Sequence, residues 1–391
     1  MEFSWKKVFT FGGAIVAYLI GSGFASGQEA MQFLVSYGLA GCIGAIVLTA
    51  SIYFGFCYAI MADGQELKLT SSNKILSYYC GKYVGKFYEF YIPVFLFMVY
   101  VVMLAGSGAI MFEYFGIPQL YGRVIMAVLS LATVLLGLNG LVNILSKLGP
   151  LIILFIVIVG GAGFVMNFEE IFKADEILNS VTVIKAAPTW YISGVIFPAM
   201  GCMMSAPFLA TLGASAKSRR EAKLGGLCGA LIFSSAVVVF AFGLLANLGD
   251  LYQKSVPTLF LANKIFPPLG MIFSIILIIG VYTTAVPMLW LSCNRITADE
   301  KSKKFKIATI VLTVIALIAS RFPFANLVNL IYPFTGYLGV FLLICILVKR
   351  LRKLSVSAKK ETSNTVNSIN TVTPVNTVTS ANTVTNDTIQ G

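Results

Sequence analysis

Long apolar runs with few charges cover the chain from residue 8 to residue 348. Residues 8–62 carry one charge, and residues 87–122 carry two. Six further runs carry none: 124–146, 148–168, 186–216, 224–249, 265–294 and 322–348. A helix needs about 20 apolar residues to cross the hydrocarbon core of a bilayer. The pattern therefore predicts an all-α integral membrane protein with several spans.

The apolar runs divide into ten predicted membrane-spanning helices. Their approximate bounds are 6–37, 40–62, 86–115, 121–140, 145–167, 189–213, 222–247, 268–293, 305–321 and 324–349. Two longer connections, 168–188 and 250–267, are amphipathic and are candidates for short interfacial helices or ordered loops. After residue 350 the apolar pattern ends, and the triplet NTV recurs at 364, 370, 376 and 382. Such polar repeats predict a disordered tail over residues 351–391.

The basic residues indicate how these spans are oriented. With the N-terminus in the cytoplasm, 22 of the 28 Lys and Arg residues fall on the inner side. The other six are Arg123, Lys173, Lys185, Lys254, Lys264 and Arg321. This asymmetry follows the positive-inside rule. It predicts a multi-pass protein of the bacterial cytoplasmic (inner) membrane, surrounded by lipid, with both termini and the tail in the cytoplasm.

Composition narrows the possible chemistry. The chain has 391 residues, of which 58% are hydrophobic and 11% charged, with a net charge of +12. Because the basic residues lie between apolar runs rather than along one face, we expect no nucleic-acid partner. There is no histidine, and the seven cysteines form no CxxC pair. We therefore expect no catalytic site, no cofactor and no transition-metal site, and we predict that the protein is not an enzyme.

Two of the predicted helices contain residues that disfavour a continuous helix. The first contains the string from Gly21 to Glu29, with three glycines in seven residues, and the sixth contains Gly194, Pro198, Gly201 and Pro207. Non-helical backbone at membrane depth is tolerated where it lines a cavity or is buried in protein. Breaks in helices one and six of ten divide the chain into two five-helix halves, about 6–167 and 189–349. Paired breaks of this kind point to the central site of a transporter.

The break in the first helix suggests specific chemistry. Gly21, Ser22 and Gly23 permit close approach of a solute to backbone N–H groups, which can hold a carboxylate. The carbonyls just before the break, near Ala17 and Ile20, can hold a cation. We also assign Gln28, Glu29 and, on the sixth helix, Gly201 to the substrate site.

These features resemble a known family. A Gly-Ser-Gly break in the first of ten helices looks like the amino acid–polyamine–organocation (APC) superfamily, which has the LeuT-type fold. The string GSGFASGQE is similar to the YkvI-type permease family of bacteria, a poorly characterised branch grouped with amino acid permeases. The resemblance covers about residues 6–349. It implies a 5+5 inverted repeat and alternating access around a midplane site for an amino acid or a related organic compound.

The resemblance also implies an ion site. In sodium-coupled members of this fold, two hydroxyl residues on the eighth helix and carbonyls of the first bind Na⁺. Thr283 and Thr284 match that pattern, and Gly280 lies on the same helical face. Oxygen ligands of this kind suit a hard cation. The alternative is that both threonines hydrogen-bond within their own helix.

The role of Glu29 stays open at this point. An intramembrane carboxylate is costly and is a candidate functional group. Glu29 is a proton site, a contact for a substrate ammonium group, or a structural acceptor. Glu89 and Glu113 are expected at the two ends of the third helix. Tyr100 and Ser107 are candidates for the site from that helix, although packing explains them better.

The sequence therefore predicts a secondary active transporter for a small organic solute, with an amino acid as the leading candidate. The expected coupling ion is Na⁺, with H⁺ as the alternative. A transporter or channel for another small solute or ion, and a membrane sensor, are the competing classes. No GxxxxGK[ST] motif is present, which argues against ATP-driven transport within this chain. The oligomeric state is left open.

Overall fold

The computed structural model describes residues 4–68, 74–136, 141–297 and 299–370. Within these ranges the side chains of Ser22, of residues 141–148, of Leu354 and of residues 356–370 are not described. Clustering of contacts separates a unit of residues 1–345 from a second unit of residues 346–391.

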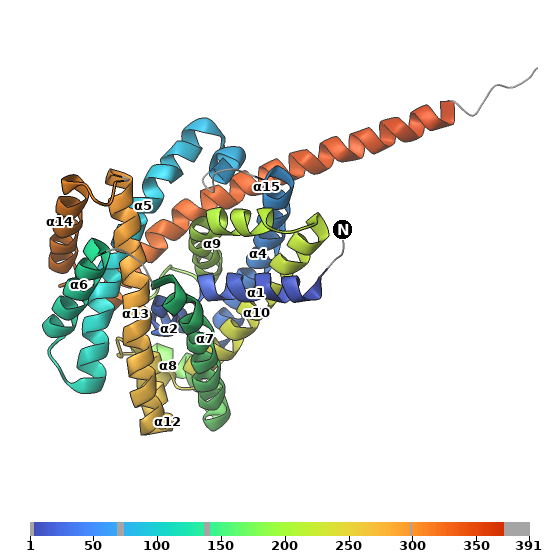
Figure 1. The fold of residues 1–391 in the computed structure, drawn as a ribbon. Helices are drawn as coiled ribbons and strands as arrows, with labels where there is room; N and C mark the ends of the chain where they lie inside the picture. Colours follow the sequence, from blue (N-terminus) through green and yellow to red (C-terminus); the bar gives the residue numbers. More distant parts are fainter. Residues whose placement is uncertain (1–3, 69–73, 137–140, 298, 371–391) are drawn as a thin grey trace, which may run out of the picture. The chain divides into compact units, whose positions relative to one another are not determined.

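All regular structure in the described residues is helical (Figure 1). The α-helices are α1 (Trp5–Leu19), α2 (Ser22–Ala25), α3 (Gln28–Phe33), α4 (Gly38–Leu67), α5 (Lys74–Phe115), α6 (Gln119–Leu136), α7 (Leu141–Met166), α8 (Ala174–Ser180), α9 (Trp190–Ala214), α10 (Arg219–Leu245), α11 (Leu248–Leu251), α12 (Pro257–Ile265), α13 (Pro267–Ile296), α14 (Lys303–Ala319) and α15 (Phe324–Asn370). Short 3₁₀ segments, η1 (Val35–Tyr37) and η2 (Phe168–Lys173), lie before α4 and α8. The two amphipathic connections thus contain η2 with α8, and α11 with α12.

Eight helical segments among the described residues are long and apolar enough to cross a membrane. They are Gln28–Leu67, Lys74–Phe115, Gln119–Leu136, Gly149–Met166, Trp190–Ala214, Arg219–Leu245, Pro267–Ile296 and Phe324–Lys353. The structure therefore shows an all-helical, multi-span protein. The first and ninth predicted spans are not among these eight segments, because α1 has only 15 residues and α14 has only 17.

The first helix is interrupted where the glycines cluster. Helix α1 ends at Leu19, and Ile20 has non-helical backbone angles (φ −92°, ψ 86°). After the single turn of α2, Gly27 adopts the left-handed conformation at φ +89° before α3 begins. A Cβ on Gly27 would lie 2.5 Å from Thr258 Oγ1, so the position needs glycine for its angle and for its space.

The expected break in the sixth predicted helix is wrong in this structure. Helix α9 is continuous from Trp190 to Ala214, through Pro198 and Pro207. Pro198 has no N–H to donate to the carbonyl of Gly194. The hydroxyl of Thr49 on α4 donates to that carbonyl instead, at 3.4 Å. A side chain from a neighbouring helix thus satisfies the group that the proline leaves free.

Small residues let α4 and α9 approach closely. A Cβ on Gly64 would lie 2.2 Å from the carbonyl oxygen of Ala210, and one on Gly213 would lie 2.3 Å from that of Met61. Close backbone approach at small residues is the usual way in which helices associate in lipid. This pairing fixes α9, and with it the Gly201 position, against α4.

The start of the tail is helical rather than disordered. Helix α15 continues without interruption to Asn370, so residues 351–370 extend a helix that is already formed. Extension avoids the cost of starting a new helix, and Lys, Arg and Leu favour helix in residues 349–354. Residues 371–391, where the last two complete NTV triplets lie, are outside the described part of the chain.

Candidate functional site

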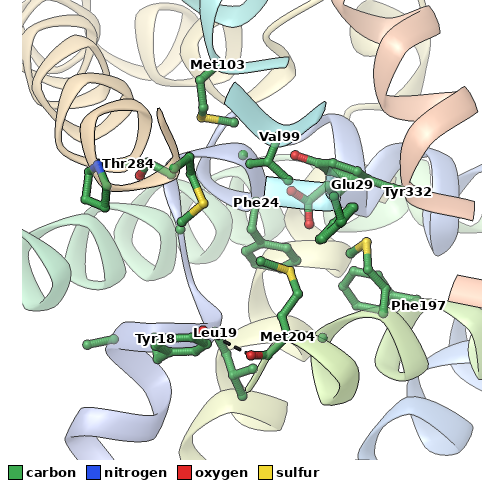
Figure 2. Close-up of a pocket in the computed structure, with 18 of the residues that line it drawn as sticks. Tyr18, Leu19, Phe24, Glu29, Val99, Met103, Phe197, Met204, Thr284 and Tyr332 are labelled. Carbon is green, nitrogen blue, oxygen red and sulfur yellow. Dashed lines mark hydrogen bonds between the residues drawn. The ribbon is translucent and has the colours of Figure 1, made fainter. Parts of the chain in front are cut away.

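A cavity of about 360 Å³ lies at the break between α1 and α2. Its walls come from α1 to α5, from α9 and α10, from α13 and from α15 (Figure 2). The lining residues are Ala17, Tyr18, Leu19, Gly21, Gly23, Phe24, Glu29, Tyr53, Phe95, Val99, Met103, Phe197, Met200, Gly201, Met204, Phe233, Thr283, Thr284, Pro287, Met288 and Tyr332. A cavity of this size is in the range of small-molecule sites.

The cavity brings together seven residues that the sequence analysis placed at a site. They come from three segments far apart in the chain, and they are Ala17, Gly21, Gly23, Glu29, Gly201, Thr283 and Thr284. The break also leaves backbone groups without helical partners. The last carbonyls of a helix and the first N–H groups of the next lack i−4 partners, and the break lies beside Leu19, Gly21 and Gly23, which line the cavity.

Four predicted site residues lie elsewhere or are only partly described. Ile20 is buried and does not line the cavity. Gly280 is buried one turn from it, and its carbonyl accepts hydrogen bonds from the hydroxyls of Thr283 (3.0 Å) and Thr284 (2.9 Å). The backbone of Ser22 begins α2, whereas its side chain lies outside the described part. Gln28 lies outside the cavity, in a separate group of amides.

We call Gln28, Gln32 and Asn329 the amide cluster. Gln28 Nε2 donates to the carbonyl of Lys254 at 2.7 Å, and Gln32 Nε2 donates to Gln28 Oε1 at 2.9 Å. Gln32 Nε2 also donates to the carbonyl of Ala325 at 2.9 Å. Asn329 Nδ2 donates to Gln32 Oε1 at 3.2 Å and to the carbonyl of Lys185 at 2.8 Å. The cluster borders a second cavity of about 250 Å³ and ties α3 to α15 and to two loops. Gln28 therefore has a structural role here rather than a position at the cavity of Glu29.

Glu29 is the charged residue of the main cavity. It is 8% exposed, and its Oε1 would lie 2.5 Å from a Cβ on Gly23. The hydroxyl of Tyr332 would lie 3.2 Å from the same point, and Figure 2 shows the two oxygen groups beside each other. Among the described side chains, none forms a hydrogen bond or ion pair with the Glu29 carboxylate. A buried carboxylate with space in front of it is a strong candidate for ligand contact.

Thr283 and Thr284 on α13 form hydrogen bonds within their own helix, which the sequence left open as the alternative to a sodium site. Both hydroxyls donate to Gly280 within their own helix. A hydroxyl group that donates a hydrogen bond can in general also coordinate a cation through its oxygen. Thr283 and Thr284 line the same cavity as Ala17 and Leu19 at the end of α1. Internal bonding and cation binding are therefore compatible.

Sequence reasoning missed the apolar wall of the cavity. The wall is formed mainly by aromatic rings and methionines, namely Phe24, Tyr53, Phe95, Phe197, Phe233, Tyr332, Met103, Met200, Met204 and Met288. Phe24 packs against Phe197, Phe233 and Phe240, with ring centroids 5.2–6.3 Å apart. Such residues are common throughout this chain, so only Phe24, within the glycine string, carried a positional signal.

The other candidates of the third predicted helix have structural partners. Tyr100 shares a hydrogen bond of 2.7 Å with Ser130, and the hydroxyl of Ser107 donates to the carbonyl of Leu104 at 2.7 Å. Neither lines the cavity. Glu89 accepts a hydrogen bond from Ser77 at 3.4 Å. Glu113 accepts the backbone N–H groups of Ser255 at 2.6 Å and Val256 at 2.9 Å.

Glu113 therefore holds the N-terminal end of α12 from α5. We expect Glu113→Gln to lower the free energy of unfolding by about 1–2 kcal/mol, because the charge that strengthens two hydrogen bonds is lost. A thermal-shift measurement on the purified variant checks this. Glu169→Gln, at an exposed position outside these contacts, is the matched control. Equal melting temperatures for the two variants would contradict the role of Glu113 in holding the N-terminal end of α12.

Comparisons with known proteins agree with this architecture. No family model matches the chain. Two proteins of Bacillus subtilis (strain 168) are similar over most of their length. The uncharacterized protein YyaD is 25% identical over 335 residues, covering 85% of this chain and 94% of YyaD. The uncharacterized membrane protein YkvI is 24% identical over 336 residues, covering 86% and 94%.

Two solved structures show the same fold. MhsT, in complex with L-phenylalanine, matches with a TM-score of 0.58 and 15% identity, covering 85% of this chain and 87% of MhsT. The inward-facing conformation of Mhp1 matches with a TM-score of 0.50 and 14% identity, covering 86% and 75%. This chain has the LeuT fold.

Proposed function

We propose that this protein is a secondary active transporter of an amino acid, driven by a cation gradient, within the APC superfamily. The observation that carries the proposal is the cavity at the break of the first helix, which gathers residues from segments far apart in the chain. Non-helical backbone that lines a cavity is the hallmark of a transporter's central site. Alternating access then opens this cavity to either side of the membrane.

The chemistry of the cavity supports an amino acid with a large apolar side chain. Backbone N–H groups at Gly21 and Gly23 suit a carboxylate, and the aromatic and methionine wall suits an apolar side chain. MhsT, which has this fold, was solved with L-phenylalanine bound.

The proposal includes a ten-span arrangement. Helices α1 and α14 are then short spans, and residues 6–167 and 189–349 form the two inverted halves. The distribution of Lys and Arg supports cytoplasmic positions for both termini in a bacterial inner membrane.

A thermal-shift screen of the purified full-length chain tests the function. The ligands are the twenty amino acids, each with sodium and with potassium as the only cation. At one hundred times its Kd a ligand adds about 2.7 kcal/mol to stability, so a true substrate raises Tm by several degrees. Stabilisation by large apolar amino acids in sodium supports the proposal. A screen in which no amino acid stabilises the protein or enters proteoliposomes overturns it.

The sodium site has its own test. We expect the double variant Thr283→Ala, Thr284→Ala to need about tenfold more sodium for half-maximal uptake, which corresponds to about 1.4 kcal/mol of ion binding. The reason is the loss of two oxygen ligands in front of the α1 carbonyls. Uptake is measured in proteoliposomes over a series of sodium concentrations.

The control for this variant lies on the same helix. Ser274 is buried, donates to the carbonyl of Met271 at 2.7 Å, and does not line the cavity. Ser274→Ala should leave the sodium dependence unchanged. If uptake by the parent protein is independent of sodium and depends on a pH gradient, the coupling ion is H⁺ and the sodium assignment is wrong.

A further inference from the structure

We infer that the cavity selects solutes for a positively charged nitrogen held by Glu29, and that a carboxylate on the solute is dispensable. The substrate class then includes amines with a bulky apolar body as well as the corresponding amino acids. This inference rests on the proposed function and specifies which part of the substrate the site recognises.

The lining of the cavity carries an unbalanced charge. Glu29 is the one residue among the described lining residues that bears a formal charge, and no Lys or Arg accompanies it. A charge removed from water needs an opposite charge or several hydrogen bonds to compensate it. No described side chain provides that partner for Glu29, so an ammonium group of the solute is the complementary group. A solute carboxylate, by contrast, meets backbone N–H groups but no fixed positive charge.

The Glu29 carboxylate lies at the break in the first helix. Glu29 Oε1 lies 2.5 Å from where a Cβ of Gly23 would stand, so the absence of a side chain lets the carboxylate reach the break, and both residues line the cavity. Tyr332 and Met103 border the same space, at 3.2 Å and 3.5 Å from a Cβ on Gly23. Glu29 thus faces the break in the first helix rather than a packed helix interface. This geometry fits a ligand contact better than a structural acceptor.

Aromatic rings line the cavity around the carboxylate. The rings of Phe24, Tyr53, Phe197 and Tyr332 line the cavity that contains the carboxylate. The faces of aromatic rings attract organic cations, most strongly where water is excluded. A single carboxylate within aromatic walls therefore suits an ammonium group attached to an apolar body.

The test uses three ligands that differ by one group each. L-Phenylalanine has both groups, 2-phenylethylamine lacks the carboxylate, and 3-phenylpropionate lacks the ammonium group. Binding to the full-length protein in lipid nanodiscs is measured by calorimetry. We expect 2-phenylethylamine to bind within about threefold of L-phenylalanine, and 3-phenylpropionate to bind more than about tenfold more weakly.

Glu29→Gln identifies the group responsible. It should weaken binding of both nitrogen-bearing ligands about tenfold or more and should not weaken binding of 3-phenylpropionate, which loses only a repulsion. Glu89→Gln, which changes a carboxyl group outside the cavity, should leave all three affinities at parent values. If Glu29→Gln does not accumulate, the three ligands on the parent protein decide the question alone.

The failures of the two proposals can be told apart. Equal binding of 3-phenylpropionate and 2-phenylethylamine to the parent protein overturns the role of Glu29 and leaves the transporter standing. Binding of L-phenylalanine without 2-phenylethylamine shows that the carboxylate is required, which also overturns the inference. Absence of binding by all three ligands overturns it too, and the separate amino acid screen then decides the proposed function.

Discussion

Uptake should be lost in Gly23→Leu, although the protein still inserts into the membrane. A Cβ at this position would lie 2.5 Å from Glu29 Oε1 and 3.2 Å from the Tyr332 hydroxyl. Glu29 can shift to admit one carbon atom, but the remaining carbons of leucine then occupy the space in front of its carboxylate. Filling a packed site in this way costs about 1–3 kcal/mol. We therefore expect uptake to fall by about tenfold to one hundredfold.

Gly13→Leu is the matched control for this experiment. Gly13 lies on α1, and a Cβ there would have open space within 4 Å. Uptake into proteoliposomes is compared for the two variants, together with the size-exclusion profile of each purified protein. Parent-like uptake by Gly23→Leu would show that the solute does not occupy the cavity at the break. A loss of uptake in Gly13→Leu as well would mean that any leucine in this region is harmful.

Gly201→Ala is the second substitution for which we expect a large effect. Its Cβ would lie 2.0 Å from the Tyr53 hydroxyl oxygen and 3.2 Å from Cζ of the same ring. Tyr53 is 2% exposed and packs edge-on against Phe233 at 4.7 Å, so the ring has little room to move. The displaced ring would intrude on the cavity. We expect uptake to fall about tenfold or more, because overpacking costs about 1–3 kcal/mol.

A second substitution should reverse much of this loss. Tyr53→Phe removes the hydroxyl, which is the atom closest to the added carbon. Uptake rates of the parent, the two single variants and the double variant form a cycle that isolates the interaction between the two positions. Recovery in the double variant identifies the steric cause. A double variant no better than Gly201→Ala would show that Gly201 is needed for a reason other than its contact with Tyr53.

The helical, membrane-spanning architecture could be predicted from the sequence because burial in lipid leaves a direct pattern of long uncharged runs. The break in the first helix was predictable for a local reason, since Gly21, Gly23 and Gly27 each weaken helix where they stand. The continuity of α9 through Pro198, by contrast, depends on a residue far away in the chain. The hydroxyl of Thr49 donates to the carbonyl of Gly194, which Pro198 leaves without its helical donor, and Thr49 lies 145 residues before Gly194 in the chain. No local sequence pattern indicates such a partner.

The residues that line the cavity also divide into those that the sequence could identify and those that it could not. Glu29 and Gly23 could be recognised because a charge and a run of glycines are rare in apolar helices. Tyr53, Phe197 and Tyr332 could not, because rings that face the cavity and rings that face lipid look alike in sequence. Phe341, for example, is 49% exposed, whereas Phe197 is 3% exposed. Only the packing of the helices decides which ring reaches the cavity.

The amide cluster has a consequence for how related sequences can diverge. Three of its hydrogen bonds end on backbone carbonyls, those of Lys185, Lys254 and Ala325. Every residue type offers that carbonyl, so evolution can change these three side chains without losing the bonds. The amides at Gln28, Gln32 and Asn329 have no such freedom. Selection on this contact therefore falls on three positions, while the side chains at the three acceptor positions, two in loops and one in α15, remain free to change.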